Sequence, residues 1–146
     1  MQLGIETKET FMATLGVGTH TSEQALAGLS NMTANVTPIQ ADEYLQRIAK
    51  AQAYMQANNI DAIYLNAGTN LTYFTGMKWY ASERMVGAIL PAIGDVQYIA
   101  PYFEIGTLNG FKVIEGPIHG WQEHESPYAL FVSVLKQLNI NDNATI

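Results

Sequence analysis

The clearest periodic pattern in the chain lies between residues 41 and 58. Side chains that are mostly apolar recur there at spacings of three and four, which places them on one face of a helix. The members of this stripe are Tyr44, Leu45, Ile48, Ala51, Gln52 and Met55. Glu43 and Arg47 are spaced for an i,i+4 ion pair on the opposite side. Because Asn58 and Asn59 tolerate the left-handed conformation that ends helices, we predict a helix over residues 41–58.

Short apolar runs bounded by turn residues follow this helix and predict strands. They cover residues 61–65, 85–90, 96–100 and 111–114. The second and third runs are separated by a turn that contains Pro91 and Gly94, which predicts a β-hairpin. Between the third and fourth runs, residues 102–109 favour a helix that stops at Gly110.

The last part of the chain predicts one more helix. Ser126 and Pro127 form a favourable N-cap and first-position pair for a helix that runs to about residue 138. Its inward residues are Phe131, Val134, Leu135 and Leu138. Residues 144–146 then have the pattern of a strand that has only begun, so we interpret the chain as a fragment of a longer protein. The alternation of helices and strands predicts an α/β fold of three layers, in which helices flank a mixed sheet.

The N-terminal part lacks a sustained period. Residues 1–21 are rich in Thr and Gly and are predicted to form an extension. A short helix is predicted from residue 21 or 22 to residue 32, because Thr21 and Gln24 have capping-box spacing. Residues 35–40 form a linker that contains Pro38. We therefore divide the chain into an extension, 1–37, and a domain, 38–146.

Composition limits the classes of function. The chain has 146 residues, of which 48% are apolar, enough for one domain with a core. Lys and Arg number 7 against 13 Asp and Glu, so a nucleic-acid partner is not expected. The apolar runs are too short to cross a membrane. The absence of Cys excludes disulfides and thiolate metal sites. We expect a cytoplasmic protein, although an exported parent with a trimmed leader stays open.

Two polar clusters contain candidate functional residues. His119, Trp121 and His124 lie in a segment, 119–125, that combines imidazoles with carboxylates. These groups suit Zn, Mn or Fe, but the spacing is not His-Glu-x-x-His and the segment is predicted to be a loop. Hydrogen bonding, or a role at an interface or cleft rim, is therefore the favoured interpretation, and no metal site is predicted.

The second cluster spans residues 79–84 and contains Trp79, Glu83 and Arg84. Arg84 is one of only two Arg in the chain. Its guanidinium has the geometry to bind a carboxylate with two hydrogen bonds, but an internal acid such as Glu83 would hold it equally well. Both interpretations stay open.

Residues 70–76 mix aromatic and small polar side chains. Tyr73 and Phe74 would either line a pocket or, as the pattern favours, pack a short helix against the sheet. The chain has no Gly-x-Ser-x-Gly nucleophile motif and no phosphate-binding glycine motif. We predict no catalytic residue in this chain.

From residue 38 onward, the order of segments resembles the N-terminal domain of creatinase and prolidase proteins. The most specific element is Asn70-Leu-Thr-Tyr-Phe-Thr-Gly76 after the run 61–65, followed by Trp79 and by Ser-Glu-Arg at 82–84. The other matching pieces are Pro38-Ile39 before residues 41–47, Leu90-Pro91, Pro101 with Phe103-Glu104, and residues 121–127. The resemblance implies a ribonuclease-H-like arrangement of the domain.

In that family the domain precedes a larger catalytic domain, which is absent from this chain. The resemblance implies that the peptidase members hold two divalent ions (Mn, Co or Zn) there, through two Asp, one His and two Glu. It also implies that the longer parent protein is an Xaa-Pro dipeptidase or aminopeptidase. The implied partners of this chain are the catalytic domain and a second copy of the protein in a homodimer. The side chains we assign to the dimer interface or to the substrate rim are Tyr73, Trp79, Glu83, Arg84, His119, Trp121 and His124.

Two alternatives remain at this point. The first alternative to a peptidase is a free-standing binding or dimerisation module. The second is the N-terminal domain of a creatinase-type amidinohydrolase that works without the metal pair. The residues 1–146 do not distinguish these from a peptidase.

Overall fold

The computed structural model describes residues 20–146, and the chain divides into two units, Met1–Pro38 and Ile39–Ile146. In the first unit, helix α2 (Ser22–Ala27) has the predicted capping box between Thr21 and Gln24. The helix ends at Ala27 instead of residue 32, and none of its residues is buried, so it gains little support from packing. Residues 1–19 of the predicted extension lie outside the described residues.

The second unit contains a four-stranded sheet in the order β1-β2-β3-β4. The first two pairings are antiparallel and the third is parallel, so the predicted mixed sheet with one hairpin is confirmed. The elements in chain order are α3 (Ala41–Ala57), β1 (Ala62–Asn66), α4 (Thr69–Thr75), β2 (Gly87–Pro91), β3 (Gln97–Pro101), the 3-10 helix η1 (Tyr102–Glu104), α5 (Ile105–Phe111), β4 (Ile118–Trp121) and α6 (Pro127–Gln137).

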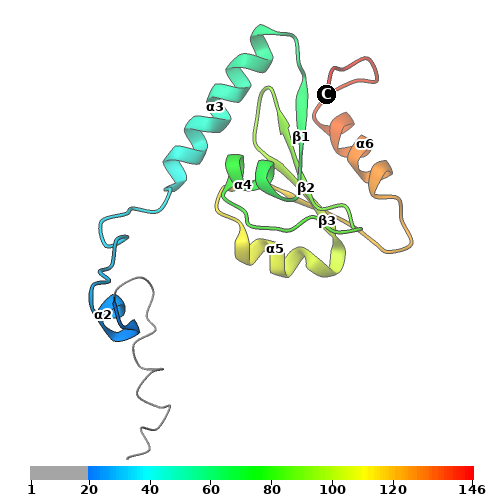
Figure 1. The fold of residues 1–146 in the computed structure, drawn as a ribbon. Helices are drawn as coiled ribbons and strands as arrows, with labels where there is room; N and C mark the ends of the chain where they lie inside the picture. The colour runs from blue at the N-terminus through cyan, green and yellow to red at the C-terminus, as the bar shows by residue number, and fades with distance from the viewer. Residues whose placement is uncertain (1–19) are drawn as a thin grey trace, which may run out of the picture. The chain divides into compact units, whose positions relative to one another are not determined.

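Helices cover both faces of this sheet, as Figure 1 shows. Alternate residues of β2 separate the two cores: Leu90 packs with residues of α3, α4 and α5, whereas Ile89 packs with residues of α6. Every residue of β2 and β3 is buried. The three-layer α/β architecture predicted from the sequence is therefore confirmed.

The two long helices follow their sequence signals closely. In α3, Ile48 and Met55 are buried, and the helix is followed by Asn59 in the left-handed conformation, with φ 52°. In α6, the Ser126 hydroxyl accepts a hydrogen bond from the Ala129 backbone N–H, and Val134 and Leu135 are buried.

The strand predicted at residues 111–114 is wrong. Phe111 is the last residue of α5, which passes through Gly110, and the following segment crosses over to β4. The parallel pairing of β4 with β3 requires such a crossover. The loop predicted at 119–125 is wrong for its first residues, because His119 to Trp121 belong to β4. Gly120 made this strand look weak in the sequence, but a Cβ there would lie 2.6 Å from the Ile105 side chain.

Residues 144–146 are not assigned as a strand. The Thr145 carbonyl nevertheless accepts a hydrogen bond from the Asp61 backbone N–H at 2.9 Å, and the Thr145 N–H donates to the Asp61 carboxylate at 2.9 Å. The segment thus contacts the chain at the residue just before β1.

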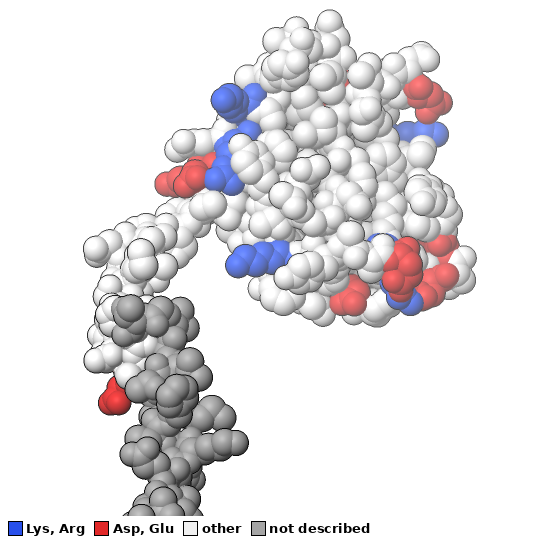
Figure 2. All heavy atoms as spheres, viewed as in Figure 1, with Lys and Arg blue, Asp and Glu red and all other residues white. Residues whose placement is uncertain are grey.

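Charged side chains are sparse on the face shown in Figure 2. This agrees with their 14% share of the sequence. Between residues 20 and 146, no helix combines the length and the hydropathy needed to span a bilayer.

Two glycine substitutions should change stability in opposite directions. A Cβ at Gly87 would clash with the Leu65 carbonyl oxygen, so Gly87→Ala should push β1 and β2 apart and lower the free energy of unfolding by about 1–3 kcal/mol. A Cβ at Gly106, in α5, meets nothing within 4 Å. Gly106→Ala should therefore raise the free energy of unfolding by up to about 1 kcal/mol. Urea denaturation followed by circular dichroism measures both changes, and equal effects of the two variants would contradict the geometry.

Candidate functional site

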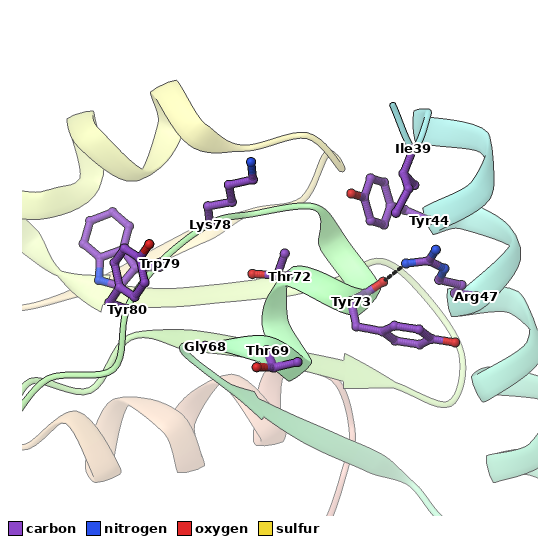
Figure 3. A pocket seen from close by; sticks show the side chains of 10 residues that line it. All are labelled: Ile39, Tyr44, Arg47, Gly68, Thr69, Thr72, Tyr73, Lys78, Trp79 and Tyr80. Atoms are coloured by element: carbon purple, nitrogen blue, oxygen red, sulfur yellow. Dashed lines mark hydrogen bonds between the residues drawn. The ribbon is translucent and has the colours of Figure 1, made fainter. Parts of the chain in front are cut away.

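The candidate site is a pocket of about 480 Å³ beside helices α3 and α4 (Figure 3). Its volume lies in the range of ligand pockets. Tyr73 and Trp79, two of the predicted site residues, both line it. The complete lining is Ile39, Tyr44, Arg47, Gly68, Thr69, Thr72, Tyr73, Lys78, Trp79 and Tyr80.

Arg47 joins the two helices that form the pocket. Its Nη1 donates to the Tyr73 carbonyl at 2.8 Å, the contact drawn in Figure 3. Its Nη2 donates to the Glu43 carboxylate at 2.6 Å, which confirms the predicted i,i+4 pair. The guanidinium also lies over the rings of Tyr44 and Tyr73, at 5.2 and 4.5 Å from their centroids. With four contacts and 19% of its side chain exposed, Arg47 is held in place and its charge is compensated.

Gly76 ends helix α4 and leaves room for the ring of Tyr44 beside the pocket. Its φ is 73°, and a Cβ there would lie 2.8 Å from the ring of Tyr44. Only glycine fits both requirements, so this residue ends α4 and leaves room for the tyrosine. The Thr72 hydroxyl then donates to the Met77 carbonyl at 2.9 Å, which fixes the start of the loop that carries Lys78, Trp79 and Tyr80.

The sequence leaves two roles open for Tyr73 and Phe74, lining a pocket or packing a short helix against the sheet, and each role holds for one of the two residues. Phe74 is half-buried and packs against the core, whereas Tyr73 is 52% exposed and lines the pocket. Trp79 is half-buried and meets Phe111 edge to face, at 6.3 Å between ring centroids. Tyr80 is 91% exposed.

Arg84 lies apart from this pocket in an acidic cluster. It forms ion pairs with Glu83 and with Glu123, its Nε donating to the Glu123 carboxylate at 2.9 Å. The hydrogen bond and charge of Glu123 raise the pKa of Arg84, and the same contact lowers the pKa of Glu123. The guanidinium also lies over the Phe103 ring. Of the two interpretations of Arg84, the structure therefore shows the internal ion pair.

The predicted residues of the 119–125 segment do not meet. Trp121 is 7% exposed in the core beneath α6, and its indole N–H donates to the Met85 carbonyl at 3.1 Å. His124 is exposed in the turn after β4, whereas His119 is half-buried in the strand. Within residues 20–146, no three His, Cys, Asp or Glu side chains come together in a way that would hold a metal ion.

His119 has a defined partner. The Gln97 amide donates from Nε2 to the Asp95 carbonyl at 2.9 Å, so its Oε1 faces the imidazole and accepts from His119 Nε2–H at 3.0 Å. Burial lowers the pKa of His119 below its usual value. The neutral imidazole is therefore the form that the fold favours.

A model of the Creatinase/Prolidase N-terminal domain family matches residues 47–145. The chain belongs to this family.

Similar proteins support the assignment of this creatinase/prolidase N-terminal domain. The probable dipeptidase PepE of Mycobacterium bovis is 27% identical over 97 residues, which are 65% of this chain and 26% of that protein. The crystal structure of the prolidase from Thermococcus sibiricus is 30% identical with a TM-score of 0.56, covering 64% of this chain and 25% of that one. The N-terminal domain of the Xaa-Pro dipeptidase from Lactobacillus brevis has the same fold, with 22% identity, a TM-score of 0.59 and coverage of 65% and 70%. The chain spans about a quarter of the length of the curated relatives it matches.

Sequence reasoning about this creatinase/prolidase N-terminal domain missed part of the pocket. The sequence pattern predicts Tyr44 in an apolar stripe and Arg47 on a solvated face, and it does not point to either as a pocket residue. Lys78 and Tyr80 flank Trp79 in the sequence and line the pocket with it. A usable signal was the scarcity of basic residues, since a rare Arg or Lys beside aromatic residues is informative in an acidic chain.

The lowered pKa of His119 should make the free energy of unfolding depend on pH. Because its pKa is lower in the folded than in the unfolded chain, the free energy of unfolding should fall as the pH drops below the unfolded value of about 6.5. His119→Gln should reduce this loss between about pH 7.5 and about pH 5. Thermal denaturation at each pH measures it, with the exposed His124→Gln as the matched control. An unchanged pH profile in His119→Gln would contradict the assignment.

Proposed function

We propose that this chain is the non-catalytic N-terminal domain of a proline-specific metallopeptidase, an Xaa-Pro dipeptidase or aminopeptidase. The observation that carries the proposal is the family match over residues 47–145, in a chain that spans about a quarter of relatives named as dipeptidases. The names of the solved relatives, a prolidase and an Xaa-Pro dipeptidase, favour peptide cleavage over a creatinase-type reaction.

The reaction itself belongs, in this proposal, to a catalytic domain outside these residues. The described part of the chain offers no cluster of ligands for the two divalent ions (Mn, Co or Zn) that such a peptidase needs. When bound by the catalytic domain, those ions would activate water and polarise the scissile carbonyl. The catalytic domain is thus the first proposed partner of this chain.

The loop between α4 and β2 supports a role at a dimer interface or at the rim of an active site. It carries Trp79 and Tyr80, and aromatic side chains and Arg are enriched in the centres of protein interfaces. At its end Arg84 is held by Glu83 and Glu123, so its orientation is fixed before any partner arrives. We propose that this loop contacts a second copy of the longer protein and borders a substrate site, in a cytoplasmic homodimer.

Substitution of Trp79 tests that role in the longer protein. Trp79→Ala should raise the KM for an Xaa-Pro dipeptide or the dissociation constant of the dimer by roughly fivefold or more, because it removes an aromatic contact. Tyr128→Ala, which truncates a 72% exposed aromatic residue on α6, is the control. Steady-state kinetics and sedimentation measure the two quantities. Equal values for both variants would assign Trp79 a purely structural part.

The isolated chain provides a second test. The 146-residue protein, supplied with Mn²⁺, Co²⁺ or Zn²⁺, should not hydrolyse an Xaa-Pro dipeptide, because its described residues contain no ligand cluster for these ions. Release of free proline, measured by chromatography, detects any turnover. Metal-dependent release that survives repurification would overturn the non-catalytic assignment.

A further inference from the structure

The lining of the pocket beside α3 and α4 contains basic residues, although the protein as a whole is acidic. The chain carries a formal net charge of -6. Yet the pocket is lined by Arg47 and Lys78, and among the described residues no Asp or Glu takes part in its lining. A hollow lined by basic residues without acidic ones attracts anions.

The two cations of the pocket differ in their availability. Arg47 is compensated by Glu43 and by the Tyr73 carbonyl. Lys78 is exposed and forms no ion pair with any residue from 20 to 146. Figure 3 shows that the two side chains come from different elements, Arg47 from α3 and Lys78 from the loop after α4. The ammonium group of Lys78 is therefore the group that an anionic ligand would meet.

Aromatic rings form much of the remaining wall. Tyr44, Tyr73, Trp79 and Tyr80 all line the pocket. Arg47 and Phe111 hold three of these rings, since the guanidinium lies over Tyr44 and Tyr73 and Phe111 meets Trp79 edge to face. Rings that are already positioned bind a flat apolar group at little entropic cost.

We propose that this pocket binds a small organic carboxylate with a flat apolar body. The carboxylate pairs with the Lys78 ammonium, and the body packs against Trp79 and the neighbouring tyrosine rings. The proposal goes beyond the accessory role proposed above, because every residue of the pocket lies between positions 39 and 80 of this chain. It therefore requires neither a catalytic domain nor a second copy.

Matched probes of equal shape test the proposal. Phenylacetate and the neutral phenylacetamide are titrated separately into the ¹⁵N-labelled 146-residue chain, and amide shifts are followed by NMR. We expect phenylacetate to shift residues around Gly68, Thr69 and Lys78 and to bind about three- to fivefold more tightly than phenylacetamide, the size of effect of an exposed ion pair. The preference should shrink in about 0.5 M NaCl.

Two lysine variants identify the charged group. Lys78→Met should bind phenylacetate and phenylacetamide equally, whereas Lys136→Met, in the last turn of α6, should keep the wild-type preference. Trp79→Ala should lower the affinity for both probes by the same factor, because it removes an aromatic wall of the pocket and no charge. Circular dichroism spectra establish that each variant is folded.

Three results would overturn the proposal. They are equal affinities of the two probes for the wild-type chain, shifts that lie outside the pocket, and the same loss of preference in Lys136→Met as in Lys78→Met.

Discussion

The complete burial of two adjacent strands is the constraint on which the rest of the domain depends. Strands β2 and β3 expose none of their residues. Their apolar side chains project from both faces of the sheet, so both faces must be covered. Helices α3, α4 and α5 cover one face and α6 covers the other. Each fully buried side chain such as Leu90 or Ile99 contributes about 1.5–3 kcal/mol through removal from water.

The pocket is a consequence of this layering. Helix α3 is long because its inner stripe follows the sheet, whereas α4 is stopped at Gly76 after two turns. Tyr44 of α3 lies against Gly76 at the end of α4, and Arg47 lies beside Tyr73 of α4. Arg47 bridges the gap by bonding to the Tyr73 carbonyl, so a polar contact joins two helices where the apolar core ends. The resulting surface is positioned by the core without being part of it.

The two basic residues at the ends of the loop between α4 and β2 differ in whether their charge is neutralised. At its end, Arg84 has two acidic partners and is neutralised within the domain. At its beginning, Lys78 has no acidic partner among the described residues and points its charge to solvent. In a chain with few basic residues, this contrast separates a structural ion pair from a cation that is available to a ligand or a partner.

The sequence by itself determined the elements whose signals are local. The stripe in α3, the left-handed Asn59 after it, the Ser126 cap of α6 and the β2–β3 hairpin all depend on neighbours within a few residues, and each was predictable. Local pattern failed at β4, where His119 and Gly120 give a poor strand signal and the pairing partner is β3, far back in the chain. Tertiary structure alone decided the distant partners of Arg84, of Arg47 and of His119, because Glu123, the Tyr73 carbonyl and Gln97 lie 39, 26 and 22 residues away from them. Contacts between residues so far apart leave no periodic trace in a sequence, since they arise only when the sheet and its helices bring distant segments together.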